Sequence, residues 1–368
     1  MIYFLVNNNY QMIDVYEHCE HLKDYEKSLI QIPHTLECID KNDNFKNIFT
    51  FYTPFKGKKN FFNILKAKKI EKEINSKLDI NKNDILFVYT EFEILNQYII
   101  ALFKREGARA YVIDEGFATY ITYGVKNEGK LTFKEKIKLI YLKYFLGYDF
   151  VEYLKFNNSV FPQINEKYIN GVLLYLDANI VRDVKKYLIN RNQKRLKLDE
   201  SKAIFLNEKM YDKYCSKEEY RSILDDIMKN MTGKFEKVYF KFHPRETDEN
   251  RKWQLEVLKK YSNVQIIEEK APIENLLGKY DAKYVFSFFS AALFNVNAIG
   301  ATPVYIYHLY DKISQNNVFK NIDLILRNAS YHFIDENYDL KNVGFENELQ
   351  NNHSWTIADV LNDALSHQ

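Results

Sequence analysis

The most regular feature of the chain is an alternation of short apolar runs with longer amphipathic segments. The short runs are rich in β-branched and aromatic residues, which predicts buried strands at 2–6, 28–32, 47–52, 84–90, 108–113, 202–207, 236–242, 264–267, 284–286 and 302–307. The longer segments have the spacing of helices and fall at 11–22, 61–76, 94–105, 217–231, 250–261, 272–280, 290–299 and 356–366. Strands that alternate with helices predict parallel, doubly wound sheets.

The alternation is interrupted in the middle of the chain, and a length of 368 residues favours two domains over one. Residues 148–176 are aromatic and fit no clear pattern, and the charged stretch 177–200 predicts a helical connector. We therefore expect an N-terminal Rossmann-like domain at 1–176, the connector at 177–200 and a C-terminal Rossmann-like domain at 201–368. The last helix is a candidate to pack back on the N-terminal domain.

Composition narrows the class of protein. The hydrophobic content of 46% supports sizeable cores, and a formal net charge of +2 gives no reason to expect nucleic acid as a partner. The three cysteines, Cys19, Cys38 and Cys215, lack metal-ligand spacing and are expected to be reduced thiols. No apolar run approaches the roughly 18 residues that span a bilayer, and residues 2–6 lack the basic flank of a signal peptide. A cytoplasmic protein is predicted.

One predicted helix, at 131–148, is basic and amphipathic. Its lysines, Lys134, Lys136, Lys138 and Lys143, are interleaved with aromatic and aliphatic residues. The first interpretation is a surface helix with a solvated lysine face. The second is peripheral docking on an anionic surface such as the inner membrane, or on a partner. Both interpretations stay open at the level of the sequence, as does the oligomeric state.

Polar residues follow several predicted strands, at the sheet edge where open α/β sheets bind their ligands. Asn8 follows the first strand, Asp114-Glu115-Gly116 and His243-Pro244 each follow a later one, and Ser287 and Ser290 flank the turn after another. Capping or turn formation would also explain each of them. Their chemistry is nevertheless complementary: a carboxylate can act as a general base, an imidazole as an acid, and hydroxyls at a helix start can bind phosphate.

These motifs resemble those of the bacterial GT-B sialyltransferases, the group that contains the lipooligosaccharide sialyltransferases and the capsular polysialyltransferases. The group shares an acidic motif that ends in glycine, an H-P motif and a later serine motif, which read here as Asp114-Glu115-Gly116, His243-Pro244 and Phe289-Ser290-Ala291-Ala292-Leu293. The lipooligosaccharide branch looks closest, because His243-Pro244-Arg245, Ile273-Glu274 and Phe288-Phe289-Ser290 follow its order. The resemblance implies an α/β protein of the GT-B type, with two doubly wound domains facing a central cleft.

The resemblance also implies roles for single residues. His243 would bind the phosphate of a CMP-sialic acid donor and act as general acid, with Pro244 near the cytosine. Glu274 would accept hydrogen bonds from the ribose, and Ser290, with Ser287, would hold the phosphate. Arg245 would pair with sialic acid or phosphate, or form an ordinary surface ion pair. Asn8 and Gly116 complete the predicted substrate-binding set.

The general base is left with alternatives. The polysialyltransferase branch implies the acidic motif, hence Glu115 or Asp114, which we rank first. The lipooligosaccharide branch implies the loop after the strand that precedes the H-P strand, where Glu208 is the candidate.

We expect an inverting transfer of sialic acid to a glycan acceptor of a capsule or lipooligosaccharide, in one in-line displacement without metal or cofactor. The alternatives are a GT-B transferase that uses CMP-Kdo or a UDP-sugar, and a non-catalytic carbohydrate-binding or capsule-assembly protein.

Overall fold

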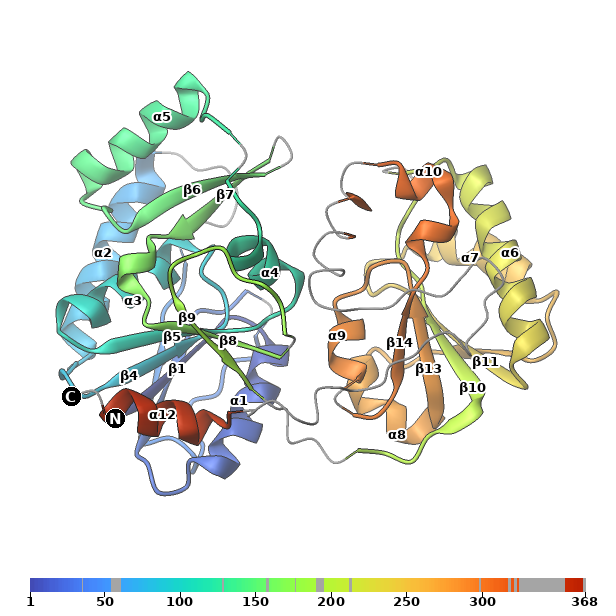
Figure 1. The fold of residues 1–368 in the computed structure, drawn as a ribbon, viewed down its shortest axis with the longest axis horizontal. Helices are drawn as coiled ribbons and strands as arrows, with labels where there is room; N and C mark the ends of the chain where they lie inside the picture. Colours follow the sequence, from blue (N-terminus) through green and yellow to red (C-terminus); the bar gives the residue numbers. More distant parts are fainter. Residues whose placement is uncertain are drawn as a thin grey trace. The chain divides into compact units, whose positions relative to one another are not determined.

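The structure is a computed structural model that describes residues 1–34, 36–53, 61–127, 129–156, 159–175, 177–189, 195–211, 214–297, 299–316, 319–320, 323 and 355–366, with the backbone alone at 61–65 and 159. The chain divides into two compact units. The first is Met1–Asn190 with Asn352–Gln368, and the second is Arg191–Asn351. Figure 1 shows that each unit is built on its own sheet with helices around it. None of the helices described here has the length and apolarity needed to cross a membrane.

The first unit contains a sheet of seven strands in the order β3-β2-β1-β4-β5-β8-β9. All neighbouring strands are parallel. The strands are β1 (Ile2–Val6), β2 (Lys27–Gln31), β3 (Asn47–Thr50), β4 (Ile85–Val88), β5 (Arg109–Ile113), β8 (Gly171–Leu174) and β9 (Lys185–Leu188). A parallel sheet needs cover on both faces, which explains why its central strands are apolar throughout instead of alternating.

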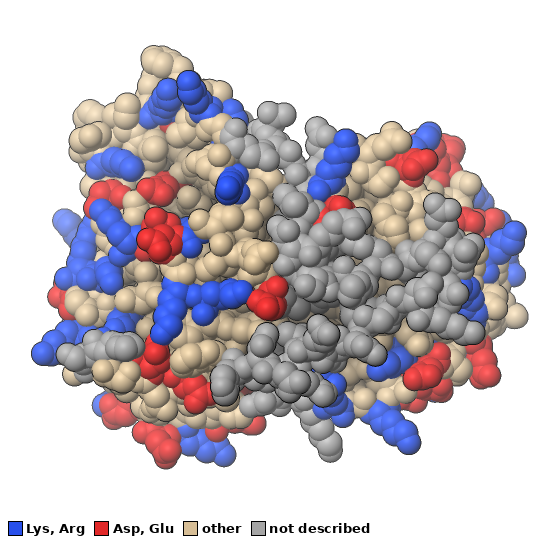
Figure 2. Space-filling model, in the orientation of Figure 1, with Lys and Arg blue, Asp and Glu red and all other residues tan. Residues whose placement is uncertain are grey.

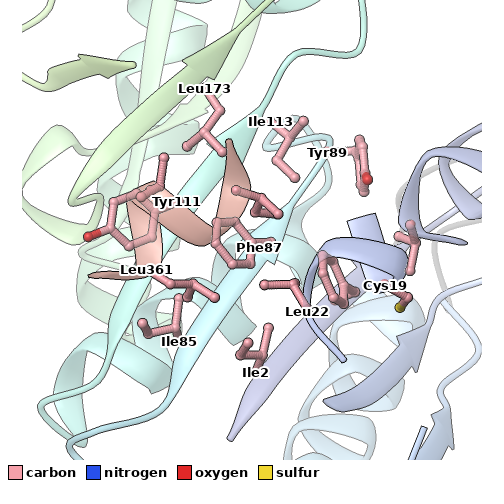
Figure 3. Close-up of a cluster of buried hydrophobic side chains, with 14 of the residues drawn as sticks. Ile2, Cys19, Leu22, Ile85, Phe87, Tyr89, Tyr111, Ile113, Leu173 and Leu361 are labelled. Carbon is pink, nitrogen blue, oxygen red and sulfur yellow. The ribbon is translucent and has the colours of Figure 1, made fainter. Parts of the chain in front are cut away.

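Helices cover both faces of this sheet. Helices α1 (Asn9–His21) and α12 (Ile357–Ser366) bury one face around Phe4 and Phe87, and Figure 3 shows Leu361 of α12 and Leu22 beside these strands. On the other face lie α2 (Phe61–Lys77) and α3 (Ile94–Arg105), and the ring of Phe103 meets that of Tyr3 at 5.0 Å. The C-terminal helix is thus part of the core of the first unit.

The prediction of a helical connector at 177–200 is wrong. Residues 185–188 form the edge strand β9, and the first unit continues to residue 190, beyond the predicted boundary at 176. Tyr187 and Ile189 alternate into the core with 2% exposure each, whereas Lys185, on the same side of the strand, is exposed and pairs with Asp363 of α12 at 2.7 Å. Lysines are typical of edge strands because they hinder pairing with another chain, and here they concealed the two-residue period. Residues 190–194 of the predicted connector lie outside the described residues.

The described residues of the aromatic region at 148–176 form regular elements. It contains the antiparallel hairpin of β6 (Val151–Phe156) and β7 (Ser159–Ile164), the short 3₁₀ turn Glu166–Tyr168, and then β8. Before the hairpin, the predicted basic helix is present as α5 (Phe133–Ile140), followed by one π-helical turn, η1 (Tyr141–Phe145). A short helix, α4 (Phe117–Gly124), follows β5.

The second unit contains five parallel strands in the order β12-β11-β10-β13-β14. The strands are β10 (Asp199–Leu206), β11 (Lys237–Lys241), β12 (Val264–Ile267), β13 (Ala282–Ser287) and β14 (Thr302–Tyr305). Figure 1 shows α6 (Lys217–Lys234) and α7 (Asp248–Leu258) on one face, with α8 (Leu277–Tyr280) and α9 (Ala292–Val296) on the other. Short helical turns occur at η3 (Ile273–Asn275), η4 (Tyr307–Leu309) and α10 (Asp311–Ser314). Helix α9 is shorter than the predicted 290–299.

In each unit the strand order reverses direction once. The reversal falls between β1 and β4 in the first unit and between β10 and β13 in the second. Open parallel sheets bind ligands beside the carboxyl ends of the strands at such a switch point. The loops that follow these strands therefore define where a site is expected in each unit.

Candidate active site

In the first unit, Glu115 extends from the end of β5 toward the start of α1. Its Oε1 atom accepts hydrogen bonds from Nδ2 of Asn8, at 2.9 Å, and from Nε2 of Gln11, at 2.6 Å. Among the described residues, no group donates to its Oε2 atom. One oxygen is thus anchored, and the other is available to accept a proton.

The environment of Glu115 suits proton transfer near neutrality. Burial raises the pKa of its carboxyl to about 7, against the opposing effect of the Gln11 and Asn8 hydrogen bonds. The adjacent charge of Asp114 adds a smaller upward shift in pKa. A general base works best when its pKa lies near the working pH, so this carboxyl has the properties of a catalytic base.

Asp114, by contrast, is a buried side chain that shapes the turn. Its Oδ1 accepts the N–H of Gly116 at 2.6 Å. Its Oδ2 accepts the hydroxyl of Tyr120 and the N–H of Tyr175, the latter at 3.3 Å. Because both oxygens are occupied, the geometry favours Glu115 over Asp114 as the base.

The sequence prediction missed Gln11, which links Glu115 to the loop after β1. Its Oε1 atom accepts the buried N–H of Asn7 at 2.6 Å, while its Nε2 atom donates to Glu115. The two bonds fix the orientation of the amide. In the sequence, the only local hint is the position of Gln11 three residues after Asn8, whose side chain caps the N-terminus of α1.

Gly116 completes the acidic turn with a backbone conformation that other residues avoid. Its φ is +118°, and it forms the N-cap of α4. We expect Gly116→Ala to destabilise the protein by about 1–3 kcal/mol, because a Cβ atom makes this conformation strained. Thermal unfolding measures the change. Gly233→Ala in α6 is the matched control. Gly233 has no positive φ, and a Cβ added there would meet no atom within 4 Å, so the change should be neutral or slightly stabilising.

In the second unit, Glu208 lies directly at the switch point between β10 and β13. Its Oε2 atom accepts the N–H of Phe289 at 2.9 Å, and burial raises the pKa of its carboxyl to about 8. Ser287 is fully buried, and its hydroxyl donates to the carbonyl of Leu206 at 2.9 Å. Glu208 and Ser287 therefore join the two loops of the switch point.

His243 begins the turn after β11. Its Nδ1 atom accepts the N–H of Arg245 at 3.1 Å. Burial lowers the pKa of the imidazole, and the nearby charges of Arg245 and Lys209 outweigh the opposing charge of Glu246. With Nδ1 occupied as an acceptor, the neutral ring carries its proton on Nε2. This nitrogen is a hydrogen-bond donor at neutral pH.

A buried polar network, also missed by the sequence prediction, holds this turn. Glu246 donates its N–H to the carbonyl of His243 at 2.9 Å, and its side chain accepts from Gln254 at 3.0 Å and from the hydroxyl of Tyr211. Gln254 in turn accepts from Asn207 at 2.9 Å. The turn that presents His243 is therefore tied to the loop after β10.

The remaining predicted residues surround the same sheet edge of the second unit. Glu274 lies on η3, where its carboxyl accepts from Nδ2 of Asn295 at 2.8 Å. Ser290 is partly exposed, and its hydroxyl accepts the N–H of Ala292 at 3.4 Å. Pro244 and Arg245 are exposed. Each unit thus assembles its own part of the predicted set.

Two parallel, doubly wound units with polar groups at their switch points define a GT-B type of fold. Over its full length, the chain is similar to the UDP-GlcNAc 2-epimerase of Methanocaldococcus jannaschii, with a TM-score of 0.51, 9% identity and coverage of 100% of this chain and 99% of that chain. The same enzyme in complex with UDP-GlcNAc and UDP gives a TM-score of 0.50 at 10% identity, with the same coverage. A glycosyltransferase from Rickettsia africae gives 0.46 at 14% identity, covering 89% of this chain and 88% of that chain. At identities this low, the two matches to the epimerase show the fold alone, and the third carries no argument.

The sequence of the chain, unlike its fold, identifies a family. Residues 3–308 match the model of the alpha-2,8-polysialyltransferase family. The match spans most of the chain, which therefore belongs to this family of sialyltransferases. No curated protein matches the chain significantly. The predicted resemblance to bacterial GT-B sialyltransferases is confirmed, and the matching family is the polysialyltransferase branch, whereas the motifs had looked closest to the lipooligosaccharide branch.

Proposed function

We propose that the protein transfers sialic acid from CMP-sialic acid to a glycan acceptor, with inversion, in a single displacement. The observation that carries the proposal is the family match over residues 3–308, which includes the acidic motif and the H-P motif. Glu115 is the proposed base, because its free Oε2 atom and its pKa of about 7 fit the task. Membership in the polysialyltransferase family supports the same choice over Glu208.

In the proposed step, Glu115 accepts the proton of the acceptor hydroxyl as its oxygen attacks the anomeric carbon of sialic acid. The bond from that carbon to the CMP phosphate breaks, and the phosphate leaves with the electron pair. His243 stabilises the departing phosphate through its Nε2–H group, and proton transfer from this group would complete general acid catalysis. Attack opposite the leaving group inverts the configuration, so a β-linked donor gives an α-linked product.

The other residues of the second unit are proposed to bind the donor. The carboxylate of Glu274 is an acceptor that suits the two ribose hydroxyls. The hydroxyl of Ser290 and the exposed guanidinium of Arg245 suit the phosphate and the sialic acid carboxylate. Pro244 lies beside His243, where its ring and carbonyl are proposed to contact the cytosine. Ser287 and Glu208 are proposed to support this site through the bonds that join the two loops.

The decisive experiment incubates the protein with CMP-sialic acid and a panel of galactosides and sialosides, with products read by mass. A mass increase of one or more sialic acid residues supports the proposal. Product formation only with CMP-Kdo or a UDP-sugar would show that the protein is a transferase that uses a different donor. Failure with all donors, together with binding of a glycan, would favour a carbohydrate-binding protein. Repeating the assay with EDTA tests the expectation that transfer needs no metal or cofactor.

Gln11 offers a separate test of the role of Glu115. Its hydrogen bond lowers the pKa of Glu115, so Gln11→Leu is expected to raise that pKa and to move the acid limb of the pH–rate profile to higher pH. The maximal rate at high pH should be largely retained, which distinguishes a change in pKa from loss of folding. In a Glu115→Gln background, Gln11→Leu should have no such effect. An unchanged pH profile in the single variant would show that Gln11 does not act through Glu115.

A further inference from the structure

Helix α5 and the π-helical turn η1 expose an apolar stripe. Phe133, Ile137, Ile140 and Tyr144 recur at intervals of four, three and four residues, which places them on one side of the helix. With Phe145 they are between 50% and 81% exposed. They account for five of the eight large apolar side chains that are exposed among the described residues. The stripe is therefore concentrated, whereas exposed apolar residues are usually scattered singly.

The lysines of this helix are placed on both sides of the stripe. At the 100° per residue of an α-helix, Lys136 lies at one edge of the stripe, while Lys134 and Lys138 lie beyond the other. Figure 2 shows the blue lysines beside uncharged surface at the part of the first unit formed by α5 in Figure 1. Lysines that border an apolar stripe can keep their ammonium groups at the level of lipid phosphates while their stems lie along the hydrocarbon boundary.

The helix is nonetheless stabilised by its N-terminal cap and by packing on the side opposite the stripe. Thr132 and Glu135 form a reciprocal cap at its N-terminus, with the N–H of Thr132 donating to Glu135 at 2.6 Å. Leu142, on the side opposite the stripe, is buried, and the ammonium of Lys138 lies 5.7 Å from the ring centre of Tyr153 in β6. The one acidic side chain of the helix is thus used in capping, which leaves the exposed face basic and apolar.

We infer that α5 and η1 are a docking element for an anionic phospholipid surface, in which the stripe enters the interface and Lys134 and Lys136 contact the headgroups. The positive charge of the lysines favours anionic lipid over a second copy of the chain. A second copy of the chain docked stripe to stripe would bring the lysine rows of both copies close together, with one capping glutamate in each to offset them. Anionic lipid neutralises the same lysines, each worth roughly 1 kcal/mol near such a surface. The inference does not depend on the donor or on the catalytic roles proposed above.

The test is sedimentation with vesicles of phosphatidylcholine alone and of phosphatidylcholine with 30% phosphatidylglycerol. We expect binding to the anionic vesicles that weakens as salt is raised. The triple variant F133S/Y144S/F145S should bind at least tenfold more weakly at every salt concentration. K134E/K136E should lose the preference for anionic lipid. The matched controls are Tyr52→Ser, at another exposed aromatic residue, and K229E/K252E in the second unit, which should bind as the parent protein does.

A fluorescence measurement reports directly whether the stripe enters the lipid, whatever the overall binding affinity. Phe133→Trp is expected to show a blue shift, and quenching by brominated lipid, on addition of anionic vesicles. Three results would overturn the inference: no sedimentation with any vesicle, binding that the stripe and lysine variants do not change, or self-association in ultracentrifugation that the triple variant abolishes. The last result would assign the stripe to a second copy of the chain.

Discussion

Replacing Glu115 with glutamine is expected to reduce sialyl transfer by about 10²–10⁴-fold, the usual contribution of a general base. A sugar hydroxyl is too weak an acid to attack without losing its proton, and the amide cannot accept that proton. The geometry should survive, because the glutamine oxygen can still accept the hydrogen bonds of Asn8 and Gln11 that Oε1 of Glu115 accepts now. Initial rates with saturating donor and acceptor measure the effect.

The pH dependence of the transfer rate tests the role of Glu115 in a second way. Since the pKa of Glu115 is about 7, the rate of the parent protein should rise with pH through that value as the carboxyl ionises. The residual rate of Glu115→Gln should lack this rise. Parallel pH profiles in the two proteins would mean that another group titrates, and Glu208, with its pKa of about 8, would be the next base to test.

Stability should change in the opposite direction to activity. The folded-state pKa of Glu115 lies above the ordinary value of 4.5, so ionisation costs folding free energy as the pH rises from about 4.5 through 7. Glutamine removes that cost. Glu115→Gln should therefore be more stable than the parent by about 1–3 kcal/mol at pH 8, with little difference below pH 4.5. An inactive variant that is also less stable at pH 8 would indicate damage to the fold instead.

The candidate site residues that the strand pattern itself indicated share one property: each follows a strand of a parallel sheet. In such a sheet the carboxyl ends of the strands meet at one edge, so Glu115 and His243 could be placed there from strand boundaries and residue type. Glu208 was added by the resemblance to the lipooligosaccharide branch. The strands themselves were visible because buried parallel strands are apolar throughout. This is why the predicted strands and the two-unit layout could be read without a structure.

The elements that were missed lack those local signals. Strand β9 carries two lysines, and β7 contains Pro162, which argues against a central strand. Gln11 and Gln254 were missed for a different reason. Gln11 bonds to a residue 104 positions away, and the Asn207 partner of Gln254 is 47 positions away. No local periodicity encodes such pairs, so the residues that orient the candidate catalytic groups were found only in the folded chain.

Removing the imidazole of His243 is the second change with a large expected effect, about 10²–10³-fold in rate, which is typical for the loss of one donor to a developing negative charge. The ring has two separate tasks. Nδ1 accepts the N–H of Arg245 and so helps to hold the turn, whereas Nε2 carries the proton that we propose for the phosphate. Asparagine and glutamine test the two functions separately. The amide of asparagine reaches the position of Nδ1, and the amide of glutamine reaches the position of Nε2.

We therefore expect His243→Asn to keep the turn and the stability of the parent but to lose the rate, together with affinity for CMP. His243→Gln should recover part of the rate, since its amide N–H can replace the Nε2–H donor. The exposed residue His21 gives the control, and His21→Asn should leave both quantities unchanged. Full activity in His243→Asn would assign the imidazole a purely structural role. Equal losses in the asparagine and glutamine variants would mean that the ring acts as an acid, which neither amide can replace, because only a titrating group can transfer a proton to the departing phosphate.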